Sequence, residues 1–249
     1  MGNLQAAIRN ELRLMLYRKK TLAFFIVSAA IPILAAFAFR SLKPVLGIFS
    51  VNPSFPIEML GLYTALWIPL FLLLSLADSF PQEVSSRTLK LALLRPVTRM
   101  KVYLAKLSAI AIGVAALMLL LLTVTLISNA MAGSVGQSFH EWFVFAKAYF
   151  AGFISMLALA TVFSMVAQLF RSASGFLIFS IVLYAAAKIA PYFVGGFSAF
   201  SLASYTDWYV LWLSGTVATS RLFSSFLFLL SGTVLFFSLG YTLFDRKEA

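Results

Sequence analysis

The sequence predicts an all-α, polytopic membrane protein with six transmembrane helices. Of its 249 residues, 62% are apolar and only 11% are charged, whereas a soluble domain is roughly half apolar and about a quarter charged. The mean hydropathy is +0.98, and the apolar residues gather in six long runs between charged residues. A surface of this kind needs lipid around it, so the composition excludes a soluble single domain.

Each apolar run is long enough to cross a bilayer core about 30 Å thick, which takes roughly 20 helical residues. The first run is longer than the apolar region of a signal peptide, and no cleavage motif follows it, so we expect it to be a retained span. The six predicted spans, within one transmembrane domain of residues 1–249, are residues 21–39, 59–77, 107–127, 148–170, 175–193 and 222–244.

The distribution of Lys and Arg predicts the orientation. Of the 19 basic residues, 14 lie on the side of the predicted bilayer that holds both termini, and four lie on the other side. Cytoplasmic loops carry the excess of Lys and Arg, so both termini are expected in the cytoplasm. The net charge of +11 follows from this topology and requires no nucleic-acid partner.

Residues 1–20 are expected to form an amphipathic helix at the cytoplasmic interface. Apolar residues recur at three- and four-residue steps, at Leu4, Ile8, Leu12, Met15 and Leu16. The basic side of such a helix would face anionic headgroups, which makes membrane lipids a predicted partner. The helix is either a simple topology anchor or an elbow helix that also contacts a protein at the membrane surface.

The cytoplasmic segment 78–106 differs from its surroundings. Pro81 suits the first turn of a helix, Glu83 favours its N-terminal end, and Pro96 ends it. These residues predict a short helix of about three turns between spans two and three. The alternative is a basic loop, but such a loop needs neither a carboxylate nor two prolines.

This segment resembles the signature of type-two ABC exporter permeases. The run Glu83-x-x-x-x-Thr88-Leu89 is followed by Leu93-x-x-Pro96-Val97-Thr98-Arg99 and then by Lys106. Six spans, an amphipathic N-terminal helix and two cytoplasmic termini fit the same family. The sequence departs from the pattern at Arg87, where the family usually has glycine.

The resemblance implies that this chain is a permease subunit whose short helix is a coupling helix that docks on an ATPase. The implied ATPase-coupling residues are Glu83, Arg87, Thr88, Leu89, Arg95, Pro96 and Arg99. The chain has no G-x-x-x-x-G-K-[ST] motif, so ATP and Mg are expected in a separate ATP-binding-cassette subunit. The resemblance also implies dimerisation with a second copy or a homologue, and a bacterial plasma membrane.

On the outer side, residues 194–221 are aromatic but interrupted by small and polar residues. They are expected to form a re-entrant segment before span six, or else an aromatic belt without a substrate role. Lys188 is the charged residue inside a predicted span. It either lines a substrate path or extends its ammonium to the outer interface.

The expected cargo is hydrophobic or amphipathic, such as a peptide, a peptide antibiotic or a lipid, because the spans are mostly Leu, Phe, Ala and Ile. Two alternatives remain open: an ion-gradient-driven secondary transporter, and a non-transporting scaffold or immunity protein that confers antimicrobial peptide resistance. An enzyme is not expected. The chain has no cysteine and a single histidine, His140, so no metal site is expected either.

Overall fold

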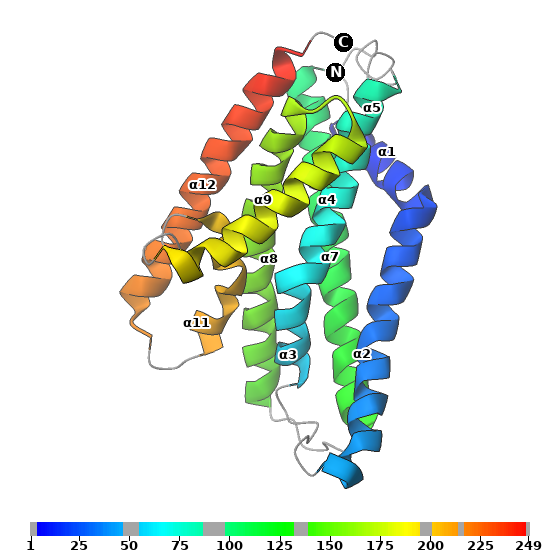
Figure 1. The fold of residues 1–249 in the computed structure, drawn as a ribbon, viewed down its shortest axis with the longest axis vertical. Coiled ribbons are helices and arrows are strands. Elements are labelled where there is room, and N and C mark those ends of the chain that lie inside the picture. Colours follow the sequence, from blue (N-terminus) through cyan, green and yellow to red (C-terminus); the bar gives the residue numbers. More distant parts are fainter. Residues whose placement is uncertain are drawn as a thin grey trace.

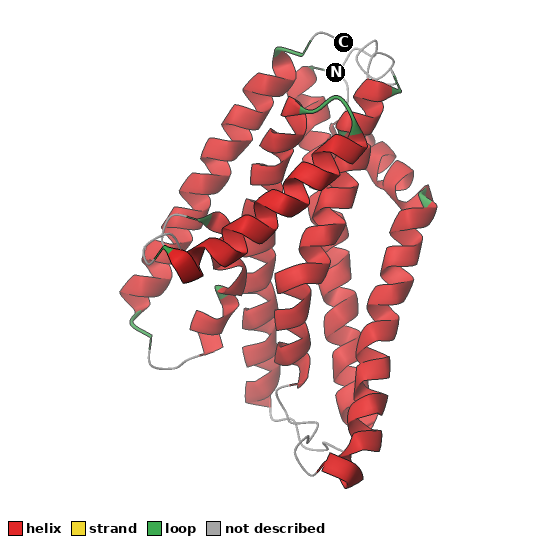
Figure 2. Cartoon of the chain, in the orientation of Figure 1, coloured by secondary structure: helices red, strands yellow, loops and turns green. Residues whose placement is uncertain are grey.

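A computed structural model describes residues 4–46, 55–86, 98–131, 139–194, 201–213 and 217–247. Within these ranges the chain is almost entirely helical and has no β-strand, as Figure 2 shows. Six helical segments are long and apolar enough to cross a membrane. The predicted fold class and the six predicted spans are therefore confirmed.

The first half of the chain provides the first three spans (Figure 1). Its elements are α1 (Leu4–Tyr17), α2 (Lys19–Leu46), α3 (Phe55–Leu62), the π-helical turn η1 (Tyr63–Trp67), α4 (Ile68–Ser79), α5 (Pro81–Ser85) and α7 (Arg99–Met131). The second half contains α8 (Phe139–Leu169), α9 (Ala173–Phe193), the 3₁₀ helix η2 (Leu202–Asp207), α11 (Tyr209–Leu213) and α12 (Thr219–Asp245).

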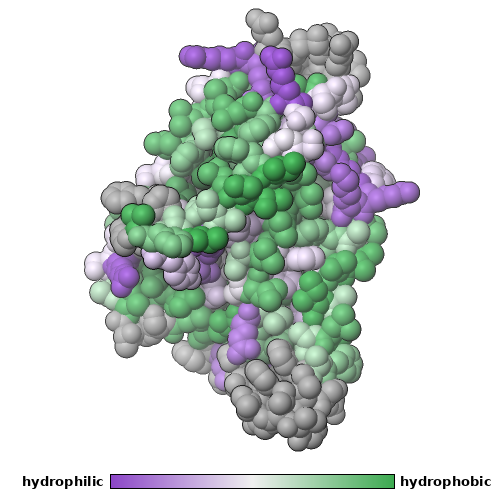
Figure 3. Space-filling model, in the orientation of Figure 1, coloured by the Kyte–Doolittle hydropathy of each residue, from purple (hydrophilic) through white to green (hydrophobic). Residues whose placement is uncertain are grey.

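Both chain ends lie at the same end of the molecule, at the top of Figure 1, and we call this the termini end. Helices α7 and α8 run through the bundle and pack against each other, with α12 on α8 and α2 on α7. Helix α9 crosses the bundle obliquely and contacts α4 and α8. Figure 3 shows apolar side chains over most of the visible face, with the largest hydrophilic area near the termini end.

The second span is not a regular α-helix. A π-helical turn, η1, separates α3 from α4, and the backbone N–H of Ile68 donates to the carbonyl of Tyr63, five residues earlier. Pro69, at the start of α4, accounts for this irregularity. Its ring conflicts with the carbonyl four residues earlier and supplies no N–H to it, so a regular α-helical ladder cannot continue there.

The segment predicted as re-entrant contains two short helices, η2 and α11. Both contact α8, and η2 also contacts η1, the irregular turn inside the second span. Trp208 is buried and its ring lies 5.4 Å from that of Trp212 and 6.3 Å from that of Phe226 on α12. Trp208 and Tyr209 therefore pack within the bundle, and the re-entrant character of the segment stays a prediction.

The termini end is held together by an aromatic cluster around Tyr103. Its side chain is fully buried, and its ring lies 5.7 Å from Phe80, 5.3 Å from Phe237 and 5.5 Å from Phe244. The Tyr103 hydroxyl hydrogen-bonds with that of Ser164 on α8 at 2.9 Å. Tyr103 thus joins the ends of α4, α7, α8 and α12.

Close contact between α12 and α8 depends on Gly240. A Cβ atom at this position would lie 3.3 Å from the Cα and 3.4 Å from the N of Met165, and it would also overlap the Tyr103 hydroxyl. We expect Gly240→Ala to lower the free energy of unfolding by about 1–3 kcal/mol, because the backbone of α8 cannot move aside cheaply. Thermal unfolding in nanodiscs measures this effect.

The matched control is Ser238→Ala on the same helix, because Ser238 is exposed and its hydroxyl bonds only to the Val234 carbonyl within α12. It should leave the unfolding temperature nearly unchanged. An unfolding temperature for Gly240→Ala equal to that of the native chain would contradict the close packing described at Gly240.

Candidate functional site

The candidate site begins at Glu83, in the first turn of α5. The α4 helix ends at Ser79 and is capped by Phe80, whose backbone N–H donates to the Leu76 carbonyl, and the chain then turns into α5 at Pro81. Proline suits this position because the first helical turn needs no N–H from it. The turn directs the Glu83 side chain back toward the bundle, where it meets Lys106 of α7.

Lys106 is a fully buried cation. Its side chain has 0% exposure, and its Nζ lies 2.7 Å from each carboxylate oxygen of Glu83. The same Nζ donates to the two carboxylate oxygens of Glu11 at 3.3 and 3.4 Å. We call Glu11, Glu83 and Lys106 the Lys106 cluster.

Glu11 reaches this cluster because α1 turns its apolar stripe toward the protein. Met15 is buried, Leu12 packs against the core, and the Met15 side chain contacts α7 at Gly113. Residues 8, 11 and 15 share one helical face, so Glu11 points the same way as this stripe. Helix α1 thus packs on α7 through part of the predicted apolar face, while Arg9 and Arg13 remain exposed. Leu16, which was predicted to belong to that face, is 55% exposed.

The Lys106 cluster constrains three helices that lie far apart in the sequence. A buried ammonium carries a large desolvation cost that only close, hydrogen-bonded carboxylates offset. Lys106 supplies three donors, and the four oxygens of Glu11 and Glu83 surround them. Helices α1, α5 and α7 must therefore dock together, or the charged groups lose their partners.

A second group of charges fixes the elbow between α1 and α2. Arg18 Nη1 lies 3.3 Å from Asp78 Oδ2, and Lys20 Nζ lies 3.7 Å from Asp78 Oδ1. Arg18 also donates from Nη2 to the Asp78 backbone carbonyl at 3.3 Å. Asp78, which directly follows the second predicted span, therefore ties the elbow to the last turn of α4.

Arg99, one of the predicted coupling residues, contacts the C-terminal end of α12. Its guanidinium donates to the backbone carbonyls of Asp245 and Lys247. The last carbonyls of a helix lack backbone partners and carry partial negative charge, so a cation is favourable there. Arg99, at the start of α7, thus holds the C-terminal end of the last span by hydrogen bonds.

The other predicted site residues are separated in space or lie outside the described residues. Arg87, Thr88, Leu89, Arg95 and Pro96 fall within residues 87–97, which the structure does not describe. At a different level of the bundle, Lys188 Nζ of α9 lies 3.1 Å from Asp207 Oδ2 of η2, with side-chain exposures of 25% and 52%. Lys188 therefore links the fifth span to the segment before the sixth.

The sequence interpretation missed the two partners of Glu83. Lys106 was treated as the boundary of the third span, and Glu11 was not considered. The signals were present, because Lys106 lies between the apolar residues 102–105 and 107, and Glu11 follows the spacing of the apolar stripe. A charged residue on an otherwise apolar face indicates a buried partner of opposite charge.

A family model for the ABC-2 family transporter protein matches residues 5–249, nearly the entire chain. The chain belongs to the ABC-2 transporter family. A search among curated proteins found no match. An ABC-2 permease is the membrane component of an ABC transporter and is not itself the ATPase, so the family implies an ATPase partner.

Within the described residues, the permease has no group of three or more His, Asp or Glu side chains arranged to hold a metal ion. The side chain of His140 lies outside the described set. The chemistry that the Lys106 cluster offers is charge pairing between helices, because the single Lys106 ammonium bonds to the carboxylates of both Glu11 and Glu83.

Removing the cation should destabilise the permease severely. We expect Lys106→Met to cost about 3–5 kcal/mol of unfolding free energy, because Glu11 and Glu83 would remain partly buried without their counter-ion. The combined variant Lys106→Met, Glu11→Gln and Glu83→Gln should recover most of this loss, because no net charge is left buried. Thermal unfolding in nanodiscs compares the two variants.

Lys19→Met is the matched control, since Lys19 is an exposed cation of the same membrane-proximal region. It should unfold at the native temperature. If Lys106→Met also unfolded at that temperature, the cluster would not hold the three helices together.

Lys247, directly after α12, has an unusual environment. Burial, assisted by the positive charge of Arg171, lowers the pKa of the Lys247 ammonium from 10.5 to about 8. The Lys247 Nζ donates to the Phe170 carbonyl at 3.4 Å. The folded permease therefore binds this proton less tightly than the unfolded chain, and the stability contributed by Lys247 rises with pH from about 8 toward 10.5.

Acylation of Lys247 by an amine-reactive ester should consequently follow a titration with a midpoint near pH 8, because only the neutral amine reacts. Quantitative mass spectrometry of the labelled protein reads this midpoint. Arg171→Met should move it upward, since the repelling charge is removed. A native midpoint above pH 10 would contradict the lowered pKa.

Proposed function

We propose that this permease is the membrane-spanning subunit of an ATP-driven exporter, with ATP and Mg bound by a separate ATP-binding-cassette ATPase. The observation that carries the proposal is the Lys106 cluster. It joins α1, α5 and α7 at the termini end, directly before residues 87–97, where the predicted ATPase-coupling residues lie. Family membership supports the same assignment.

In this proposal, the ATPase docks on the segment around Arg87, Thr88, Leu89, Arg95 and Pro96. Movement of that segment pulls on α5, because α5 continues directly into it. The ion pairs of Glu83 then carry the displacement to Lys106 and into α7. Helix α7 has 33 residues and is about 50 Å long, so the displacement reaches the opposite end of the bundle.

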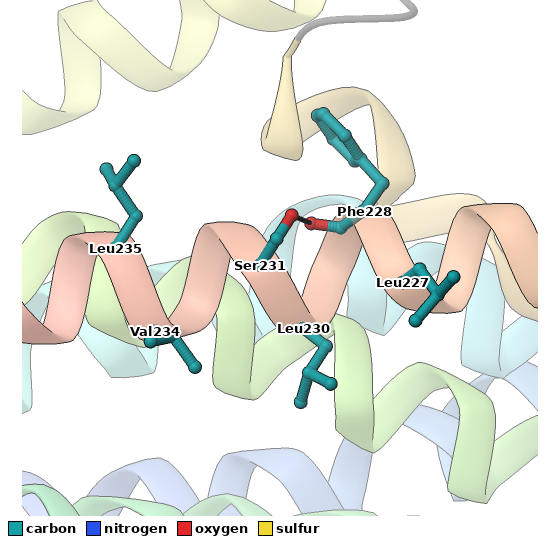
Figure 4. Close-up of a pocket in the computed structure, with 6 residues that line it drawn as sticks. All are labelled: Leu227, Phe228, Leu230, Ser231, Val234 and Leu235. Carbon is teal, nitrogen blue, oxygen red and sulfur yellow. Dashed lines mark hydrogen bonds between the residues drawn. The ribbon is translucent and has the colours of Figure 1, made fainter.

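The transmembrane surface supports a hydrophobic or amphipathic cargo. A shallow groove runs along α12 and is lined by Leu227, Phe228, Leu230, Ser231, Val234 and Leu235, which Figure 4 shows. Its one hydroxyl, from Ser231, donates to the Phe228 carbonyl of the same helix at 2.9 Å. The surface of the groove is therefore apolar. Such a surface suits a hydrophobic peptide, a peptide antibiotic or a lipid that is taken from the bilayer.

The proposed assembly contains two permease chains, either identical or homologous, in a bacterial plasma membrane. The apolar faces that α2, α9 and α12 leave exposed provide surface for the second chain and for lipid. The excess of Lys and Arg at the termini end supports a cytoplasmic location of both termini. Lys188, paired with Asp207, is the candidate polar residue of the substrate path, and export of membrane-active peptides would confer resistance to them.

Affinity purification of tagged permease from its native membrane tests the proposal. We expect an ATP-binding-cassette subunit to co-purify, and ATP hydrolysis to be measurable in the eluate. Arg95→Glu should weaken the binding of the ATPase roughly 5- to 150-fold and reduce its recovery accordingly, because reversing one charge in a contact of this kind costs on the order of 1–3 kcal/mol.

Lys147→Glu is the control, because it makes the same charge change at an exposed residue near the opposite end of the bundle. It should retain the ATPase at the native level. If no ATPase accompanies the native chain, or if Arg95→Glu binds as much ATPase as Lys147→Glu, the proposed coupling segment is wrong.

A further inference from the structure

A proline opens the helical backbone within the first span and within the second, apart from Pro191 near the end of α9. Pro32 lies inside α2, and Pro69 lies at the start of α4, directly after the π-helical turn η1. A proline has no N–H, so the carbonyl four residues before it loses its α-helical partner. These carbonyls belong to Ser28 in α2 and to Ala65 in η1.

Each opened carbonyl accepts a tyrosine hydroxyl from a different span. Tyr63 of η1 donates to the Ser28 carbonyl at 2.7 Å, and Tyr184 of α9 donates to the Ala65 carbonyl at 2.6 Å. An unpaired carbonyl in hydrocarbon costs several kcal/mol, so these hydroxyls replace the missing backbone bonds. The two bonds form a chain from α9 through η1 to α2.

The surroundings of this chain hold the hydroxyls in place. Trp67 Nε1 donates to Ser28 Oγ at 2.6 Å, and the ring of Phe24 lies 4.6 Å from that of Trp67. Tyr63 and Ser28 are fully buried. The first and second spans are therefore also in contact at the point where each backbone is interrupted.

A tyrosine–carbonyl bond differs mechanically from the backbone bond that it replaces. A tyrosine side chain can keep its hydrogen bond when the carbonyl tilts, or release that carbonyl for another acceptor. Neither change requires a helical turn to unwind. Turns of the π type and prolines are the usual sites where a helix bends. A helix can therefore bend where a carbonyl without a backbone partner accepts a tyrosine hydroxyl from a neighbouring span. The tyrosine then sets the angle of the bend, and we call such a position a pivot.

We propose that Pro69 and Pro32 form two linked pivots, and that Tyr184 and Tyr63 are the positioning residues that set them. The pivot at η1 lets α4, which continues through Phe80 into α5, tilt relative to α3. The Tyr63 bond then transmits that tilt to α2. This inference rests on the proposed function, because the displacement of α5 would come from the ATPase.

Hydrogen exchange of the full chain in nanodiscs, read by mass spectrometry on peptides covering residues 60–70, tests the pivots. We expect Tyr184→Phe to speed exchange in this region about fivefold, the effect of losing one hydrogen bond. We expect Pro69→Ala to slow it by a similar factor, because alanine supplies an N–H to the Ala65 carbonyl.

Tyr149→Phe is the matched control. The Tyr149 hydroxyl also donates to a carbonyl of the second span, that of Pro56, at 3.0 Å. Four residues after Pro56 lies Leu60, which has a backbone N–H, so this carbonyl is not opened by a proline. Tyr149→Phe should leave exchange at residues 60–70 unchanged.

The same measurement is repeated with the co-purified ATPase, without nucleotide and with ATP plus orthovanadate. Nucleotide should change exchange at residues 60–70 in the native chain, and Pro69→Ala should reduce that change while ATPase binding persists. The proposal is overturned if Tyr184→Phe and Tyr149→Phe behave alike, if Pro69→Ala does not slow exchange, or if nucleotide leaves residues 60–70 unaffected.

Failure of the proposed function gives a different result. In that case no ATPase accompanies the native chain, and the inference that nucleotide drives the pivots falls with it. The nucleotide-free comparison of Tyr184→Phe, Pro69→Ala and Tyr149→Phe still decides whether the tyrosine bonds close the opened carbonyls.

Discussion

The buried ammonium group of Lys106, near the end of a membrane-spanning helix, constrains the helices that pack around it. Lys106 can remain charged there only because carboxylates from α1 and α5 approach to between 2.7 and 3.4 Å. The N-terminal helix is consequently part of the folded bundle rather than an attachment to it. The position of α5 is fixed by the same cation.

The middle of the bundle satisfies its polar groups by other means. Backbone groups at that depth need partners within the protein, and the two prolines remove N–H groups from the first and second spans. Neutral tyrosine hydroxyls replace them, whereas ionic groups hold the termini end. The molecule thus combines an end held by ion pairs with a centre held by neutral hydrogen bonds, and in the proposed mechanism the helix contacts readjust at this centre.

Much of this architecture could be predicted from local sequence features. The length and hydropathy of each apolar run predicted six spans, because the thickness of the bilayer sets the length of a crossing helix. The apolar spacing of residues 4–16 predicted the first helix. Glu83 could be identified from its place at the start of a short helix and from the motif that begins with it. Its partner Lys106 was assigned only to a boundary, because the two residues meet through a turn at Phe80 and Pro81 that spacing does not specify.

The sequence by itself determined the class of the molecule, the number of its spans and the end that carries most of its positive charge, since hydropathy and charge are properties of individual segments. Only the tertiary structure decided which charges and hydroxyls are paired. Glu11 and Lys106 are 95 residues apart, and Tyr184 and Ala65 are 119 apart. Such pairs exist because packing brings helices together, and the free energy of burial favours partners that satisfy buried charges and carbonyls.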